Sequence, residues 1–410
     1  MLSQQPTETA PEALGGQQQL FLILQERIER GFYAPGAWLP AERALAEEFR
    51  LDRSAVRRAL CQLEEAGLIV REPGRRPWVR GGLAAATRQL TPIRQAPPAR
   101  STPAAAGPGR RRPRSASPGE TGLRTIVAIL PQHPQYPASL AILHGINAAL
   151  RSAEAPFRLQ VIDTHGGADS RETRLEQQAL ASVVRERIAG AVLWQLGGAE
   201  TVPQLRELEA RSIPVVFVDR FPPELACDFV GGDNQAGVET AIEYLHSLGH
   251  RRIAHLTTDE PSTAVLQRRD AYTGALTLAG TLPDPDLIFA VPHTDTAHVA
   301  PACDHFFSLA DLPTAVLAMN DPLAYRFIAE CLKRGLRVPE DISVIGFDDL
   351  DQHSPRPSLL TTLNQPFDKI GRRAAELLLA RLSGPDTVPN VRRHILLPTP
   401  LIKRATCRAI

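Results

Sequence analysis

Two sets of polar side chains in this 410-residue sequence have types and spacings suited to binding chemistry. The first is a pair of arginines, Arg53 and Arg57, one turn apart at the start of a predicted helix. Cations there oppose the helix dipole, so a structural role would favour the opposite end. From that position they could reach guanine edges or phosphates in a DNA major groove. The alternative is a solvated face on which they pair with Asp52, Glu47 or Glu48.

The second set consists of polar residues that directly follow apolar, strand-like runs. They are Trp194, Asp219, Asn320, Asp321 and Asp348, while Arg268 lies just beyond the loop after a further run. Parallel α/β folds bind ligands outside the carboxyl ends of their strands. Carboxylates and a guanidinium can hold vicinal hydroxyls, and an indole can cover the apolar face of a sugar, so a neutral polyhydroxylated ligand is indicated. For Asn320, Asp321 and Asp348 the alternative is a helix cap or turn.

A small N-terminal domain must position the arginines. Apolar spacing predicts helices over 17–31, 40–49 and 54–66, the last with Ser54 as its N-cap. Short strands at 68–70 and 78–80 would flank the turn at 72–77. Three helices and a hairpin predict an α+β winged helix-turn-helix over residues 17–80, preceded by a disordered N-terminus at 1–16.

The polar residues of the second set lie in a large α/β region, residues 123–410. Continuous apolar strands with intervening helices indicate parallel sheets covered on both faces, and their number suggests two lobes. We predict strands at 125–130, 158–162, 190–193, 215–218, 252–256, 315–319 and 343–347. We predict helices at 138–153, 172–187, 201–211, 234–248, 266–279, 322–334 and 367–383.

Residues 81–122 read as a disordered linker between these domains. They hold seven Arg against Glu120 alone, are rich in Pro and Ala, and contain almost no large apolar side chain. Such a segment cannot bury enough surface to offset its chain entropy. The run RRRPR at 110–114 is either solubilising charge or a site of non-specific attraction to phosphates.

Several classes of protein are excluded or disfavoured by what the sequence lacks. No apolar run approaches the roughly 18 residues of a membrane helix, and the first residues do not resemble an export signal. Five scattered cysteines without a CxxC pair fit a reducing cytoplasm and suggest no zinc site. We find no nucleophile-elbow, zinc-protease, P-loop or dinucleotide motif, so we expect no enzyme, no metal and no cofactor.

The stretch LPAERALAEEFRLDRSAVRRALCQLEEAGLIVREPGRRPWV resembles the DNA-binding domain of GntR-type bacterial transcription regulators. The resemblance implies that Arg43, Arg53 and Arg57 contact DNA, that the Ser54 hydroxyl binds a phosphate, and that Arg75 lies at the wing tip. Two departures stand out. Asp52 replaces the usual small hydroxyl residue and could draw Arg53 away from DNA, and the wing reads GRRPW instead of G-x-G-T-F.

The body resembles the effector domain of LacI-type repressors, which have the fold of periplasmic sugar-binding proteins. The matching stretches include IPVVFVDR, VGGDNQAGVETAIEYLHSLGHRRIAHL, AVLAMNDPLA, GLRVPEDISVIGFDD and LLTTLNQPFDKIGRRAAELL. The resemblance implies effector binding by Arg268, Asn320, Asp348 and Gln365, with Asp321 either adjoining the site or capping a helix. Asp233 and Asn234 belong to a motif that we interpret as mainly structural. The segment QHPQYP departs from the family pattern, although Tyr136 could supply its aromatic contact.

The same resemblance implies how the chain divides between the lobes. Lobe 1 is expected at about 123–219 plus 366–397, and lobe 2 at about 220–363 plus 398–410.

Together these patterns predict a cytoplasmic repressor that binds a pseudo-palindromic double-stranded operator as a homodimer and responds to a small sugar. The combination of head and body resembles arabinose-responsive repressors. The alternative is a regulator with a nucleobase or sugar phosphate as co-repressor.

Overall fold

The computed structural model describes residues 16–29, 33, 36–71, 76–80, 124–132, 137–153, 156–166, 172–293, 299–351, 358–383 and 391–410. The predictions for 1–15, the wing tip with Arg75, the linker 81–122 and Tyr136 lie outside these residues. No helix in the described part of the chain combines the length and apolar character needed to cross a membrane.

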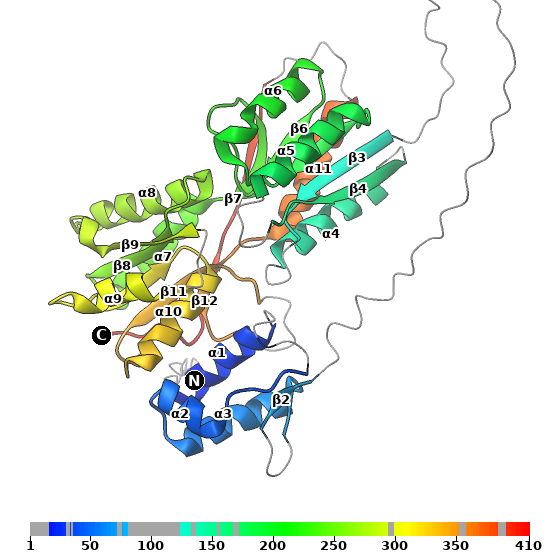
Figure 1. Ribbon diagram of the computed structural model, residues 1–410. Helices are drawn as coiled ribbons and strands as arrows, with labels where there is room; N and C mark the ends of the chain where they lie inside the picture. The colour runs from blue at the N-terminus through cyan, green and yellow to red at the C-terminus, as the bar shows by residue number, and fades with distance from the viewer. Residues whose placement is uncertain are drawn as a thin grey trace, which may run out of the picture.

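The N-terminal domain, or head, is built from three helices and a two-stranded hairpin (Figure 1). Its elements are α1 (Gly16–Glu29), α2 (Glu42–Glu48), α3 (Arg53–Glu65), β1 (Ile69–Val70) and β2 (Trp78–Val79). β1 and β2 pair antiparallel, with Ile69 opposite Val79. Apolar side chains from all of these elements form one core, including Leu20, Leu24, Leu45, Val56, Leu60, Ile69 and Val79.

The N-cap of α3 is Asp52, and the prediction of Ser54 was wrong. The Asp52 carboxylate accepts a hydrogen bond from the backbone N–H of Ala55 at 2.9 Å, and Ser54 already lies within the first turn. A carboxylate is favoured there because it meets both an orphan N–H and the positive end of the helix dipole.

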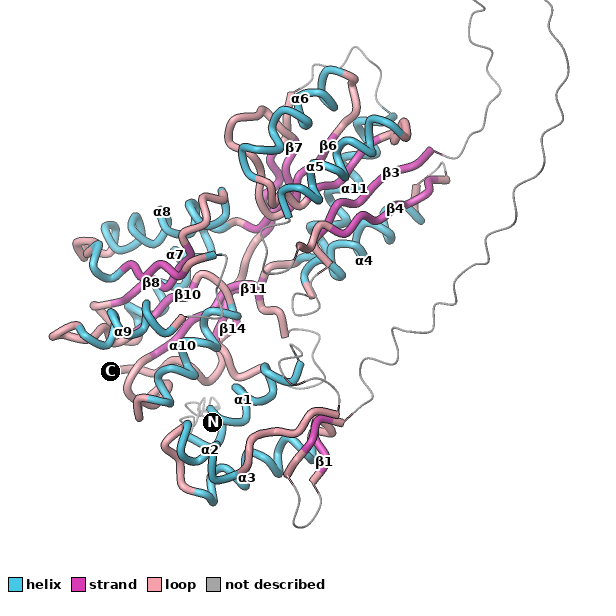
Figure 2. The backbone as a smooth tube through the Cα atoms, in the orientation of Figure 1, coloured by secondary structure: helices cyan, strands magenta, loops and turns pink. Residues whose placement is uncertain are grey.

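Lobe 1 of the body is a parallel six-stranded sheet in the order β13-β7-β6-β5-β3-β4 (Figure 2). Alternate residues of β3 contact opposite layers: Ile126 and Ala128 pack with α4 and α11, whereas Val127 and Ile129 pack with α5 and α6. The strands are β3 (Arg124–Leu130), β4 (Phe157–Asp163), β5 (Gly190–Leu193), β6 (Val215–Val218), β7 (Asp228–Gly232) and β13 (His394–Leu397). The helices are α4 (Ala138–Arg151), α5 (Glu172–Arg185), η3 (Gly198–Thr201), α6 (Val202–Ala210) and α11 (Phe367–Ser383).

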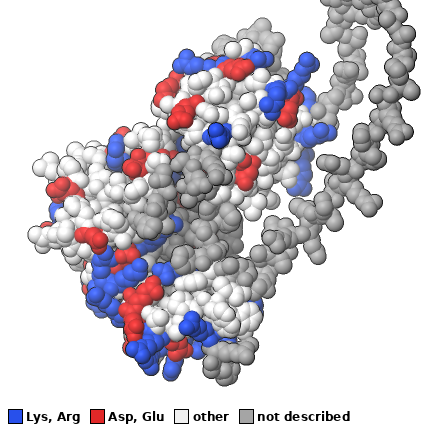
Figure 3. Space-filling view, in the orientation of Figure 1, with Lys and Arg blue, Asp and Glu red and all other residues white. Residues whose placement is uncertain are grey.

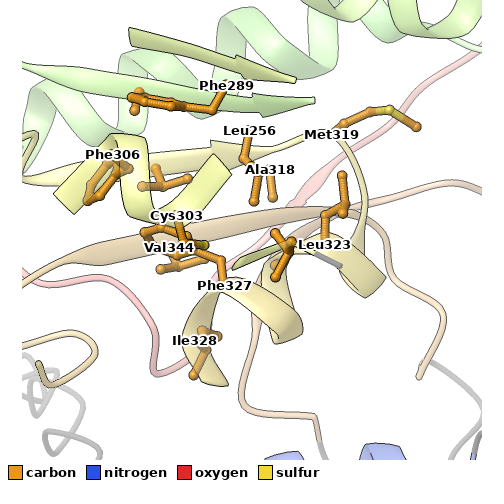
Figure 4. Packing of buried hydrophobic residues seen from close by; sticks show 14 of the residues in the cluster. Leu256, Phe289, Cys303, Phe306, Ala318, Met319, Leu323, Phe327, Ile328 and Val344 are labelled. Carbon is orange, nitrogen blue, oxygen red and sulfur yellow. The ribbon is translucent and has the colours of Figure 1, made fainter. Parts of the chain in front are cut away.

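Lobe 2 has the sheet order β14-β12-β11-β10-β8-β9, in which β12 and β14 pair antiparallel and the other neighbours pair in parallel. Its strands are β8 (Ile253–Thr258), β9 (Ile288–Val291), β10 (Ala315–Ala318), β11 (Ser343–Asp348), β12 (Thr361–Asn364) and β14 (Leu401–Ile402). Its helices are α7 (Asn234–Ser247), α8 (Thr263–Leu278), η4 (Pro285–Leu287), α9 (Ala300–Ser308) and α10 (Asp321–Lys333). Phe327 of α10 packs edge-on against Phe306 of α9, and Figure 4 shows both with Leu323 in one apolar cluster beside the sheet.

The first crossing between the lobes lies later than predicted. β7 pairs with β6 and β13, so residues 228–232 belong to lobe 1, and lobe 2 does not begin at 220. Lobe 2 starts with α7, after Gly232. The chain returns to lobe 1 between β12 and α11, at residues 365–366, and crosses again between β13 and β14, at 398–400.

Two glycines let α4 and α11 touch backbone to backbone in lobe 1. A Cβ on Gly145 would lie 1.9 Å from the carbonyl oxygen of Asp368, and one on Gly371 would lie 2.0 Å from that of Ile142. Neither backbone can yield without separating the helices. The helix that follows the second crossing is therefore fixed to lobe 1 from its first turns.

Candidate functional sites

The recognition helix α3 presents its arginines to solvent because its other face is committed to the core. Val56, Leu60 and Leu63 are fully buried. Arg53, at the first position, and Arg57, one turn later, are exposed. Ser54 is exposed as well, and its hydroxyl donates to the Asp52 carboxylate.

Arg43 and Arg57 form exposed ion pairs. Arg43 Nε donates to Glu47 Oε1 at 2.7 Å, and Arg57 Nε donates to Glu42 Oε2 at 2.8 Å. The carboxylates raise the pKa of both guanidinium groups. Arg57 thus forms an ion pair on a solvated face, but with Glu42 and with none of the three partners that the alternative named. Exposed pairs of this kind are weak and can be exchanged for phosphate contacts.

Arg53 makes no ion pair with the residues that the structure describes, and Asp52 does not draw it aside. Hydrogen bonds from Ser54 and from the Ala55 N–H hold the pKa of Asp52 below its usual value. Acidic and basic side chains both lie on the visible surface of the head (Figure 3). Because Glu47 and Glu42 lie against Arg43 and Arg57, DNA binding here would depend on a few placed arginines more than on an unbroken basic patch.

Arg268, in the second turn of α8, is the centre of a buried polar cluster and only 3% exposed. Its Nε donates to Asn234 Oδ1 at 2.9 Å and its Nη1 to the carbonyl oxygen of Met319 at 2.7 Å. Its Nη2 lies 3.5 Å from Asp348 Oδ1, and its guanidinium carbon lies 3.6 Å from the centre of the Phe347 ring. The planar guanidinium is thus fixed by four groups.

Gln365, at the second crossing, joins this cluster to lobe 1. Its Nε2 donates to Asp348 Oδ1 at 2.9 Å and to Asp219 Oδ1 at 3.3 Å, and all three side chains are buried. Asp219 and Asp348 have φ angles of 66° and 105°, in a region that residues with a Cβ seldom adopt. Such backbone tends to occur at binding sites, where the surroundings hold it in place. The structure therefore brings together Arg268, Asp348, Gln365 and Asp219.

Asn320 and Asp321 lie beside this cluster at the start of α10, where both have structural bonds. Asn320 Oδ1 caps the helix by accepting from the Leu323 N–H at 3.0 Å. Asp321 accepts from Thr362 Oγ1 at 2.5 Å and from the Leu350 N–H at 3.0 Å. Burial, together with the nearby Asp348 carboxylate, raises the pKa of Asp321 well above its usual value. The cap alternative thus describes Asn320 in this structure.

Trp194 belongs to the lobe 1 core. It is 4% exposed, and its ring stacks on Phe367 with centroids 6.0 Å apart. The indole offers little surface to a ligand in this arrangement, in contrast to the covering role that its position after a strand suggested.

Two further residues belong to the site but were not among the predicted binding residues. Asn234 binds Arg268, although the motif containing it was interpreted as structural. Asp233 does cap α7, through the Ala236 N–H at 3.0 Å. Arg220 pairs with Asp219 and with Glu260 of lobe 2. Its position next to Asp219, directly after a strand, was the available signal.

Comparison with known proteins bears on both domains. Residues 17–79 match a family model described as bacterial regulatory proteins, gntR family, and residues 242–407 match one described as a periplasmic binding protein-like domain. The HTH-type transcriptional repressor CytR of Escherichia coli K12 is 30% identical over 287 residues, covering 70% of this chain and 80% of CytR. The HTH-type transcriptional regulator CelR of Thermobifida fusca is 32% identical over 258 residues, covering 62% of this chain and 72% of CelR.

A solved structure of a LacI transcriptional regulator from a Rhodococcus species is 26% identical, with a TM-score of 0.57. The match covers 70% of this chain and 98% of that one. The named relatives are regulators of transcription, and the two family models match the head and the body separately.

Proposed function

Because the chain belongs to the LacI-type transcriptional repressors and carries a GntR-type winged helix-turn-helix, we propose that a neutral, polyhydroxylated effector controls its affinity for an operator. The chain is a DNA-binding transcription regulator with a periplasmic-binding-protein-like body.

One observation carries the choice of ligand: the buried and half-buried side chains around Arg268 include more carboxylates than guanidinium groups. Arg268 and Arg220 face Asp219, Asp348 and Glu260, and Asp321 adds a further carboxyl group. A phosphorylated ligand would meet this excess negative charge, whereas hydroxyl groups can donate to the carboxylates and accept from the guanidinium. A pentose, hexose, disaccharide or nucleoside fits this chemistry.

On the DNA side, Arg43, Arg53, Ser54 and Arg57 would contact the operator. As a homodimer in the cytoplasm, the protein would place two heads on half-sites roughly 34–36 Å apart, which requires a pseudo-palindromic sequence. Selection of bound duplexes from a randomised pool tests this, since an inverted repeat is expected and a single asymmetric site would contradict the dimer.

Thermal unfolding of the full chain tests the effector. Neutral sugars and nucleosides should be compared with sugar phosphates and nucleobases, because a ligand at about 100 times its Kd adds roughly 2.7 kcal/mol of stability. We expect a shift from a neutral compound. It should be lost in Arg268→Lys, which keeps the charge but not the planar fork, and kept in Arg269→Lys. A shift from sugar phosphates or nucleobases alone would favour the alternative effector class.

A further inference from the structure

Arg58 lies on the exposed face of the recognition helix and differs from the neighbouring arginines in its partners. Its Nε donates to Gln17 Oε1 at 2.6 Å and its Nη1 to Ser54 Oγ at 3.0 Å. Arg58 forms no ion pair with a described carboxylate, whereas Arg43 and Arg57 are each paired with a glutamate. The guanidinium of Arg58 is therefore held in place by neutral groups, and no paired carboxylate offsets its charge.

The Ser54 hydroxyl is occupied by the same set of bonds. It donates to the Asp52 carboxylate and accepts from Arg58, so its proton is not available to a phosphate. The oxygens of a DNA phosphate are hydrogen-bond acceptors and require a donor. The donor that remains at this position is Arg58, whose Nη2 makes no hydrogen bond with the described residues. Asp52 and Ser54 thus orient the guanidinium of Arg58.

Arg58 lies at one edge of the recognition helix. Successive residues of an α-helix are about 100° apart around its axis, so Arg57 and Arg58 point toward different neighbours. Arg57 pairs with Glu42 of α2, whereas Arg58 bonds to Gln17 in the first turn of α1. A recognition helix in a major groove has a sugar-phosphate backbone along each of its edges. Arg58 is thus placed to meet the backbone on the α1 side of the groove.

The starts of two helices add positive potential at this edge. A Cβ on Gly16, the first residue of α1, would lie 2.4 Å from Leu51 Cδ2, so α1 begins against the turn that precedes α3. Apart from the capping Asp52, neither helix has an acidic residue at its start that would offset the helix dipole. Helix N-termini attract phosphates for this reason, and Arg58 is bonded to the first turns of both helices.

We propose that Arg58 is a contact to the DNA backbone, positioned for a phosphate by Gln17 and Ser54. The contact adds affinity for any duplex and no preference for a sequence, whereas Arg53 and Arg57 face the bases. This inference deepens the proposed function and rests on the DNA-binding face named there. It also specifies how Ser54 serves operator binding, which is through Arg58.

Binding titrations of the full chain at several salt concentrations test the contact. The probes are a duplex selected from a randomised pool and a duplex of the same length with a shuffled sequence. Arg58→Gln should weaken binding to both about 10-fold at low salt and reduce the slope of log K against log salt by about one. Arg58→Lys, which keeps the charge, should restore the slope. Arg211→Gln, the same change as Arg58→Gln on an exposed arginine of lobe 1, should alter neither quantity.

Arg53→Ala separates failure of this contact from failure of the whole DNA-binding face. In that variant, binding to the selected duplex should fall more than binding to the shuffled one. If it does and Arg58→Gln leaves the salt slope unchanged, the face stands and the backbone contact is overturned. A loss in Arg58→Gln that is confined to the selected duplex would assign Arg58 to a base and also overturn the inference. If neither variant weakens binding, both the face and the contact are wrong.

Gln17→Ala tests the positioning of Arg58. The charge of Arg58 stays, so the salt slope should not change, but affinity should fall about threefold because the guanidinium is no longer oriented in advance. In the Arg58→Gln background the same change should leave affinity as it is, since the side chain that Gln17 positions is gone. Equal losses in the two backgrounds would overturn the positioning role of Gln17.

Discussion

Arginines serve both halves of this protein, in opposite surroundings. In the head, the side chains of Arg43 and Arg57 are 76% and 63% exposed, and each pairs with one glutamate, the exposed Glu47 and the half-buried Glu42. In the body, Arg268 is 3% exposed and is held by Asn234, Asp348, a backbone carbonyl and an aromatic ring. Under the proposed function, the exposed arginines would exchange their glutamate partners for DNA, whereas Arg268 is already held in one orientation.

The largest effect is expected when the buried arginine is removed. Arg268→Ala leaves the buried Asp348 carboxylate without its cation, which should destabilise the body by about 3–5 kcal/mol. Chemical denaturation of the full chain measures this loss. Arg269→Ala removes a neighbouring arginine that is half exposed and should change stability little. Equal losses would contradict the distinction between the two environments.

The next largest effect is expected on the affinity for DNA, with no change in the stability of the protein. Arg53→Ala should weaken binding to a selected operator about 10- to 100-fold, as expected for a lost base contact. Its thermal unfolding should match that of the original chain, because the side chain is exposed. Arg211→Ala, which removes an exposed arginine at the C-cap of α6 in lobe 1, is the control. A similar loss of affinity in that variant would indicate non-specific attraction.

A third test concerns the buried polar cluster around Arg268, in which carboxylates outnumber guanidinium groups. Asp321→Asn keeps a side chain that can accept from the Leu350 N–H, and its amide can donate to Thr362 Oγ1. The raised pKa of Asp321 means that its contribution to stability is fully present below the unfolded pKa and is lost as pH rises through the folded pKa. Chemical denaturation at several pH values should show that the free energy of unfolding of the variant increases relative to that of the original chain as pH rises. A constant difference across pH would contradict this.

The smallest effect should come from releasing an exposed arginine. Glu42→Gln removes the partner of Arg57, so this arginine no longer exchanges an ion pair for a phosphate. Operator binding should tighten by no more than about fivefold, and the gain should shrink as salt rises. Binding titrations at two salt concentrations measure it. Weaker binding would mean that Glu42 positions Arg57 for DNA.

Local patterns were predictable from the sequence. The apolar stripe of the recognition helix predicted 54–66, and the structure has Arg53–Glu65. The residues after the strands, with Gln365 supplied by family resemblance, included Arg268, Asp219 and Asp348, which do meet. Both successes depend on short-range spacing or on a rule about where strands end.

Long-range pairing was not predictable in this way. The position of β7 in lobe 1 depends on β13, more than 160 residues later, where Val230 lies opposite Ile395. The role of Asn234 depends on the approach of α8 to α7, which no local pattern encodes. Both Asp52 and Ser54 are suitable N-caps for α3 by residue type. Asp52 is the cap because its carboxylate lies within hydrogen-bond distance of the Ala55 N–H.

The backbone contact between α4 and α11 limits where the two lobes can pivot. Since Gly145 and Gly371 hold α11 against α4, this helix cannot slide to absorb a change of angle. At this crossing the rotation must fall on the few bonds between β12 and α11, and Gln365 is one of the two residues there. A molecule that takes over the hydrogen bonds of Gln365 restrains the same torsions that set the angle between the lobes. Recognition and hinge stiffness are then properties of a single residue.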